Sequence, residues 1–149
     1  MRKISLDIAH AFKGKDKRSI SNTSTDGKRI LLHGNEIASW NDDNSLVVSM
    51  CNWPTVTTRE RINTLFYVLD IPFNMFQDNY GQFIRDYSGL PNASLKSLSS
   101  GHYGFVADIN PKDHYAFHKQ KDLHSLFDTN VNVWHIKHME ANHEYLIKR

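Results

Sequence analysis

The order of apolar and polar positions predicts a three-stranded antiparallel meander in the first third of the chain. Residues 29–33 and 36–40 are strand-like and flank Gly34-Asn35, two residues that tolerate positive φ in a tight hairpin turn. Residues 41–44 form a second turn, made of Asn and Asp side chains that bond their own backbone, and residues 46–51 then alternate between two faces. We therefore predict three consecutive strands joined by two turns.

A helix is predicted to follow this meander. Proline cannot donate to a strand ladder, so Trp53-Pro54 should end the sheet, and Thr57 with Glu60 three residues later matches a capping box. Apolar residues then recur on one helical face, at Ile62, Leu65, Phe66 and Leu69. Residues 73–77 and 82–86 flank a turn-like stretch, which predicts a second hairpin that continues the sheet.

These elements predict an α+β fold with three parts. Residues 1–20 form an amphipathic basic arm, in which Ile4, Ile8, Ala11 and Phe12 predict a short helix ending near Gly14. This helix should dock on its own domain or on a second copy of the chain. Residues 14–18, continued by residues 19–25, are interpreted as a flexible basic loop. Residues 21–88 form an antiparallel βββαββ core, and residues 89–149 form a mixed α/β, histidine-rich extension packed on it.

Histidines are concentrated near the C-terminus, where seven of the nine lie between His102 and His143. Asn110-Pro111 resembles a helix start, and His114, His118 and Asp122 would then lie on one helical face, a donor set that could hold zinc. The glutamate of metalloprotease helices is missing between the two histidines, which argues against that chemistry. A solvated polar face and a pH-responsive partner face stay open as alternatives. Residues 131–136 alternate like a strand.

Composition narrows the class of protein. The chain has 149 residues, 40% of them hydrophobic, which is enough for one buried core, and it contains no apolar run long enough to span a membrane. Its single cysteine, Cys51, cannot form an intramolecular disulfide. We therefore do not expect this protein to be secreted. Cys51 should also be a buried, inert thiol rather than a nucleophile. The formal charge is +4 in residues 1–20, −3 in residues 21–111 and +1 in residues 112–149.

Aromatic and basic residues supply the candidate binding groups. Exposed aromatics such as Trp40 and Trp53, beside Arg59 and Arg61, would suit a protein-binding hot spot or base stacking, although packing in the core is the plain alternative. The mildly acidic body favours a protein over a nucleic acid. Phosphates could instead be contacted by the basic segment, through Lys13, Lys15, Lys17 and Arg18.

Three motifs carry a family resemblance. They are the TDGK sequence at residues 25–28, the LLHGNEIASW sequence at residues 31–40, and Trp53 followed by TTRERIN at residues 57–63. This pattern resembles that of a family of small proteins encoded by bacteriophages, over about residues 20–88. The resemblance implies a phage origin and expression in the cytoplasm of a bacterial host, and it brings no catalytic residues.

We therefore predict a non-enzymatic phage accessory protein, without a membrane anchor, that binds and modulates a host or phage protein, with a homo-oligomer also open. The first alternative is a nucleic-acid-binding protein that uses the basic N-terminal loop and exposed aromatics. The second alternative is a metal-dependent hydrolase built on His114, His118 and Asp122. No cofactor is expected apart from the zinc of that last alternative.

Overall fold

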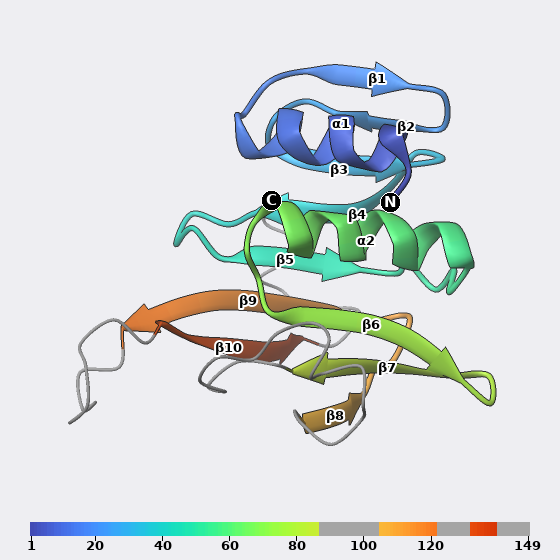
Figure 1. Cartoon of the computed structure of the whole chain (residues 1–149), viewed down its shortest axis with the longest axis vertical. Helices are drawn as coiled ribbons and strands as arrows, with labels where there is room; N and C mark the ends of the chain where they lie inside the picture. Colours follow the sequence, from blue (N-terminus) through green and yellow to red (C-terminus); the bar gives the residue numbers. More distant parts are fainter. Residues whose placement is uncertain (87–104, 122–131, 140–149) are drawn as a thin grey trace.

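A computed structural model of the chain describes residues 1–86, 105–121 and 132–139. Within these residues, two helices accompany two antiparallel sheets, so the predicted α+β class is confirmed (Figure 1). The larger sheet has the strand order β1-β2-β3-β4-β5-β9-β10, and the smaller has the order β6-β7-β8. The elements are α1 (Lys3–Lys13), β1 (Arg18–Ile20), β2 (Thr23–Thr25), β3 (Arg29–Leu32), β4 (Asn35–Trp40), β5 (Leu46–Ser49), α2 (Val56–Val68), β6 (Phe73–Asp78), β7 (Gly81–Asp86), β8 (Phe105–Asp108), β9 (His114–Lys121) and β10 (Asn132–Met139).

The predicted meander is confirmed as β3-β4-β5. The turn between β3 and β4 lies at His33-Gly34, with φ values of 51° and 80°, one residue before the predicted Gly34-Asn35, because Asn35 already begins β4. The meander is longer than predicted, because residues 18–25 are not a flexible loop. They form β1 and β2, and β2 pairs with β3 while Thr23 and Thr25 point into the protein. The loop prediction was wrong because two strands of only three residues leave almost no periodic signal.

The two helices lie side by side over one face of the larger sheet (Figure 1). The predicted N-terminal helix is confirmed as α1, which buries Ile8, Ala9 and Phe12. Phe12 stacks on Trp40 of β4, with ring centroids 5.0 Å apart. The apolar stripe of α1 is therefore covered by the protein's own fold, which was one of the two predicted ways of docking it.

The second helix begins earlier than its predicted capping box. Its N-cap is Thr55, whose hydroxyl accepts a hydrogen bond from the backbone N–H of Thr58 at 3.1 Å. The cap predicted at Thr57 is therefore wrong, and Glu60 instead contacts Ser5 and Thr64. The predicted apolar face is confirmed, because Ile62, Leu65 and Phe66 are buried and Leu69 packs against them.

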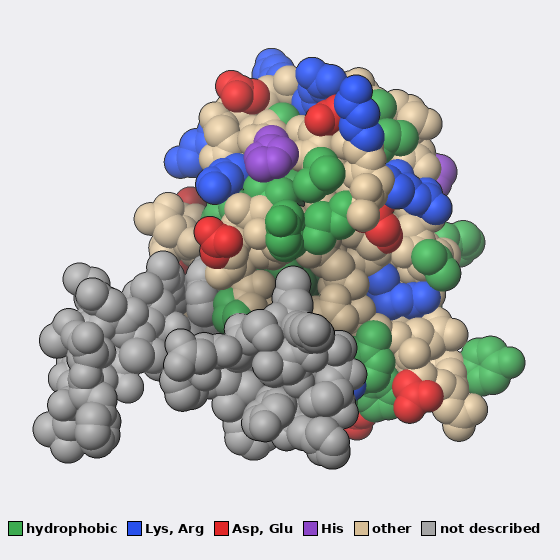
Figure 2. All heavy atoms as spheres, viewed as in Figure 1, with side chains coloured by type: hydrophobic (Ala, Val, Ile, Leu, Met, Phe, Trp, Pro, Cys, Tyr) green, Lys and Arg blue, Asp and Glu red, His purple; other side chains and the backbone are tan. Residues whose placement is uncertain are grey.

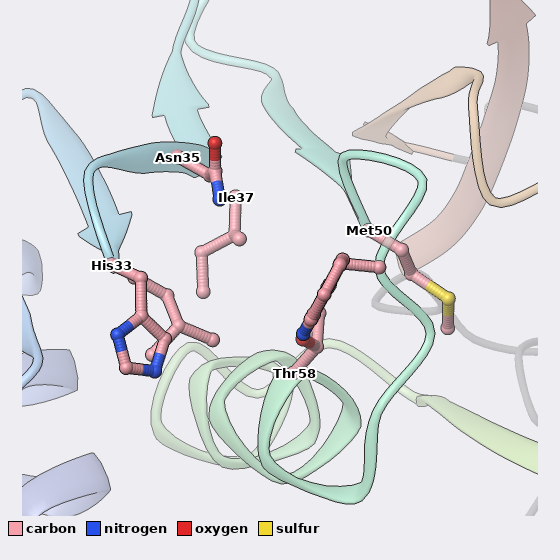
Figure 3. A pocket seen from close by; sticks show the side chains of 7 residues that line it. His33, Asn35, Ile37, Met50 and Thr58 are labelled. Atoms are coloured by element: carbon pink, nitrogen blue, oxygen red, sulfur yellow. The ribbon is translucent and has the colours of Figure 1, made fainter.

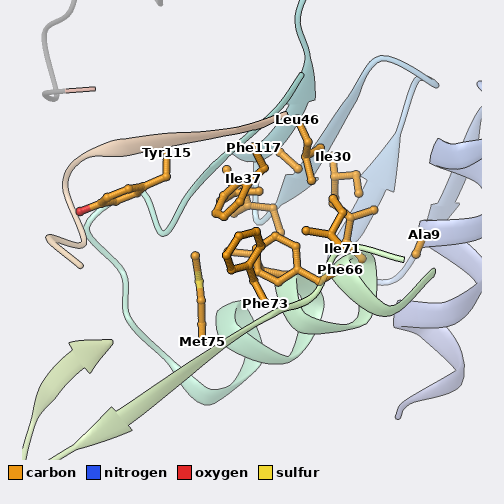
Figure 4. Packing of buried hydrophobic residues seen from close by; sticks show 14 of the residues in the cluster. Ala9, Ile30, Ile37, Leu46, Phe66, Ile71, Phe73, Met75, Tyr115 and Phe117 are labelled. Atoms are coloured by element: carbon orange, nitrogen blue, oxygen red, sulfur yellow. The ribbon is translucent and has the colours of Figure 1, made fainter. Parts of the chain in front are cut away.

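The second hairpin is confirmed as β6-β7, with its turn at Asn79 and Tyr80. It does not continue the larger sheet, because β7 pairs with β8 in a separate one. A shared aromatic cluster connects the two sheets, in which the Phe66 and Phe73 rings each lie within contact distance of Phe117 (Figure 4). The core is therefore built from residues distant in sequence.

The helix predicted to begin at Pro111 is wrong, since His114–Lys121 is the strand β9. It lies between β5 and β10 and pairs with both. Tyr115 and Phe117 point into the main core, whereas Ala116 packs with Val47 and Met139 on the opposite face. This alternation is that of a strand buried on both faces. The strand predicted for residues 131–136 is confirmed as β10.

Candidate interaction surface

A pocket of about 300 Å³ opens where three segments meet: the β3–β4 turn, the loop after β5 and the first turn of α2 (Figure 3). Its floor and walls are mainly apolar, and an imidazole, an amide and a hydroxyl belong to its lining. The lining residues are Leu32, His33, Asn35, Ile37, Met50, Trp53 and Thr58.

The loop after β5 determines the position of the pocket's exposed tryptophan. Cys51 and Asn52 both have positive φ, which reverses the chain, and the Trp53 N–H then donates to the Met50 carbonyl at 2.9 Å. The Asn52 N–H is held by the Pro111 carbonyl at 2.8 Å. Trp53 consequently stays at the rim of the pocket, where 61% of it is exposed.

The apolar exposure extends beyond Trp53. Pro54 is exposed, and Val56 at the start of α2 is 69% exposed. We call Trp53, Pro54, Val56 and the pocket lining the Trp53 patch. Val56 is an apolar residue outside the apolar face predicted for α2. This position was the sequence signal from which its exposure could have been predicted. The pocket itself could not be predicted, because its lining comes from three segments that are separate in the sequence.

Arg59 connects the loop that carries Trp53 to the β6-β7 hairpin through hydrogen bonds. Its guanidinium donates to the Pro54 carbonyl at 3.0 Å and to the side-chain oxygens of Gln77 and Gln82 at 3.1 and 2.9 Å. Burial lowers the pKa of Arg59 from its ordinary value. The predicted candidate Arg59 thus ties the Trp53 loop to the β6-β7 hairpin.

Two of the predicted binding residues, Trp40 and Arg61, pack or bond within the fold instead of lying on the surface. Trp40 is partly buried against Phe12, and Arg61 is only 5% exposed. The Arg61 guanidinium donates to Glu60, to Ser5 at 2.7 Å and to Thr23 at 3.0 Å. The expectation that Trp40 and Arg61 form an exposed binding surface is therefore wrong, because both hold elements of the fold together.

The TDGK motif forms the β2–β3 turn. The Thr25 hydroxyl accepts from the Gly27 N–H at 3.0 Å and donates to the Arg29 carbonyl at 2.6 Å. The Asp26 carboxylate accepts from the N–H groups of Lys28 and Arg29, and these two bonds lower the pKa of Asp26. The motif is thus a self-bonded turn.

Gly27 fits this turn for two separate reasons. Its φ is +90°, and an added Cβ would lie 2.5 Å from the Lys15 backbone. Gly34 offers a matched control, since its φ is +80° but nothing lies within 4 Å of a Cβ there.

We expect Gly34→Ala to lower the free energy of unfolding by about 1–2 kcal/mol and Gly27→Ala by roughly 2–3 kcal/mol, measured by urea denaturation. Equal losses would show that the Lys15 contact adds nothing.

The metal site predicted on His114, His118 and Asp122 required a helix, but His114 and His118 lie on the strand β9. On a strand, residues four apart share a face but lie about 13 Å from each other, too far for one ion. Asp122 lies outside the described residues. Within residues 1–86, 105–121 and 132–139, no three His, Cys, Asp or Glu side chains group as a metal site requires.

Cys51 is half-buried, and its thiol donates to the Glu36 carbonyl at 3.0 Å. Burial raises the pKa of this thiol, with the carboxylate of Glu36 adding to the effect. A thiol with a raised pKa carries little thiolate at neutral pH, so it is a poor nucleophile. These surroundings fit the inert cysteine expected from the sequence.

Of the helices that the structure describes, none has the length and apolar character needed to cross a membrane.

The remaining predicted binding residues are exposed around the end of α1 and the start of β1; they are Lys13, Lys15, Lys17 and Arg18. They lie away from the pocket, toward the opposite end of β3.

Comparison with known proteins gives a phage family. No curated protein and no solved structure matches the chain. The family model of the Kyanoviridae Gp96 protein matches residues 1–103, a longer stretch than the motifs recognised in the sequence and one that runs from α1 past β7. Because this match covers more than half of the chain, the protein belongs to the Kyanoviridae Gp96 family of bacteriophage proteins.

Proposed function

We propose that this protein is a non-enzymatic phage accessory protein that binds a host or phage protein through the Trp53 patch. The observation that carries the proposal is the exposure of Trp53 and Val56, at 61% and 69%, beside an apolar pocket of about 300 Å³. Family membership supports the phage accessory role.

The chemistry of the patch favours a protein partner. Contiguous exposed apolar groups usually mark interaction sites, and an exposed tryptophan next to a pocket is typical of an interface hot spot. The pocket volume lies at the lower end of the range for small-molecule sites, and it suits one inserted apolar side chain. His33 and Asn35 lie beside it and could bond the backbone of such a segment (Figure 3).

The hydroxyl of Thr58, which lines the pocket, and the thiol of Cys51, in the loop after β5, are engaged in structural bonds. The Thr58 hydroxyl lies 3.0 Å from that of Thr55, and the neighbouring Cys51 thiol donates to a backbone carbonyl. Among residues 1–86, 105–121 and 132–139, neither group bonds a base that would activate it as a nucleophile. This arrangement supports binding rather than catalysis at the patch.

We expect Trp53→Ala to weaken partner binding by about 2 kcal/mol, or roughly 30-fold in Kd, because a hot-spot tryptophan would be lost. The partner would be captured from host lysate with and without nuclease, and its Kd then measured with the purified pair. Tyr80→Ala is the matched control, because Tyr80 is an 89% exposed aromatic on the β6-β7 turn.

Unchanged binding of Trp53→Ala, or equal losses in both variants, would contradict a role for the patch. If the captured protein is the chain itself, the patch is a homo-oligomer interface. If capture disappears with nuclease, the protein partner is replaced by a nucleic acid.

A further inference from the structure

Exposed cations from four segments gather near the start of β3, at the opposite end of that strand from the pocket. The last residue of α1, the loop after it, the start of β1 and the β2–β3 turn all contribute. We call this group the basic end; its members are Lys13, Lys15, Lys17, Arg18, Lys28 and Arg29. Lys and Arg side chains are prominent at the α1 and β1 end of the molecule in Figure 2.

Backbone contact joins these segments. Gly27 of the β2–β3 turn lies so close to Lys15 that an added Cβ would be 2.5 Å from its carbonyl carbon. This contact adds Lys28 and Arg29 to the four basic residues recognised in the sequence. The resulting surface therefore holds more basic residues than any single basic stretch of the sequence does.

The segment after α1 is ordered by its own hydrogen bonds. The N–H groups of Gly14, Lys15 and Asp16 donate to carbonyls of the last helical turn at 3.0, 3.1 and 2.8 Å. These bonds occupy carbonyls at the end of α1 that would otherwise repel an anion. The lysines are thus mounted on ordered backbone, which reduces the entropy lost on binding.

Three acidic residues share this region, and two of them are already paired. Asp26 bonds Arg29 at 3.2 Å, and Asp7 lies 3.8 Å from Arg18. Asp16 is exposed beside Gly14. In the part of the chain that the structure describes, Lys15, Lys17 and Lys28 form no ion pair. The basic end therefore keeps a positive excess.

We propose that the basic end binds the phosphate backbone of duplex nucleic acid, independently of the Trp53 patch. The six residues that make up the basic end carry charge and no aromatic ring, so they suit contacts to phosphates better than stacking on unpaired bases. Binding of this kind is independent of sequence and falls steeply with salt.

The two surfaces can be tested separately because β3 lies between them. Arg29 begins this strand at the basic end, and Leu32 ends it at the pocket. A protein with both surfaces could hold a protein partner next to nucleic acid. Trp53→Ala should accordingly leave duplex binding unchanged.

The test is fluorescence anisotropy of the full chain with a labelled DNA duplex of arbitrary sequence, over a series of salt concentrations. The triple variant Lys15→Ala, Lys17→Ala, Lys28→Ala should weaken binding at least tenfold at low salt. If each lysine contacts one phosphate, it should also flatten the slope of log K against log salt by about 2.7. The matched control is Lys3→Ala, Lys112→Ala, Lys137→Ala, three exposed lysines elsewhere with the same change in net charge.

Retained duplex binding by the control, together with its loss in the first triple variant, supports the proposal. Equal losses in the two triple variants would overturn it, since net charge alone would then explain binding. Tighter binding of a single strand than of the duplex, or equal binding of polyglutamate, would overturn the choice of partner. Absence of duplex binding by the wild-type chain at low salt would overturn the proposal altogether.

Discussion

Phe117→Ala is expected to lower the free energy of unfolding by about 3–5 kcal/mol, the range for removing a large aromatic ring from a packed core. Phe117 is 0% exposed, and its ring centroid lies 5.0 Å from those of both Phe66 and Phe73 (Figure 4). These three rings come from β9, α2 and β6. The cavity would open where the two sheets and a helix meet, a site that cannot collapse easily.

Urea denaturation followed by circular dichroism measures this loss. Tyr67→Ala is the control, because Tyr67 is an exposed aromatic on α2 and its removal should change stability by no more than about 0.5 kcal/mol. A loss below about 1 kcal/mol for Phe117→Ala would contradict the burial of this ring. It would thereby reopen the helical interpretation of residues 114–121.

Elements with a strong local signal could be predicted from the sequence. The β3–β4 turn depends on Gly34 and its neighbours, and the face of α2 is determined by the spacing of Ile62, Leu65 and Phe66. The hairpin β6-β7 was likewise marked by its turn residues. In each case, residues adjacent in sequence decide the structure, and distant contacts only reinforce it.

The strand β9 shows what local patterns miss. Asn110 was interpreted as a helix cap, and its side chain does accept an N–H, that of Lys112 at 3.1 Å, but it caps only a turn. The pairing that makes residues 114–121 a strand comes from β5, more than sixty residues earlier, and from β10. Such partners are invisible to a pattern read along a short window, because β-structure depends on context.

The candidate site was predictable to a similar extent. Trp53 was recognised as one of the aromatic residues expected to be exposed, and its 61% exposure agrees with this. Lys28 and Arg29 were not joined to the N-terminal lysines, because only the Gly27–Lys15 contact brings them together. Arg61 was misplaced on the surface, since arginine is rarely buried unless it is paired, and its partners come from two other segments, α1 and the start of β2.

Arg61→Ala is expected to destabilise the protein by about 3–5 kcal/mol, because breaking a buried ion pair leaves its partner uncompensated. Arg61 pairs with Glu60 at 2.8 Å and bonds Ser5 of α1 and Thr23 of β2. Ser5 and Thr23 are almost wholly buried, so the loss of the guanidinium deprives their hydroxyls of a donor that water cannot easily replace. One side chain therefore connects both helices with the larger sheet.

The double variant Glu60→Gln, Arg61→Met distinguishes lost pairing from lost packing. Removing both charges while keeping most of the side-chain volume should restore part of the stability lost in Arg61→Ala, since desolvation of the pair opposes its attraction. Arg2→Ala, at an exposed position, controls for the loss of one positive charge. Thermal and urea unfolding would report the order Arg2→Ala, then the double variant, then Arg61→Ala as least stable. If Arg61→Ala were instead as stable as Arg2→Ala, the guanidinium would not be holding α1 and β2 against α2.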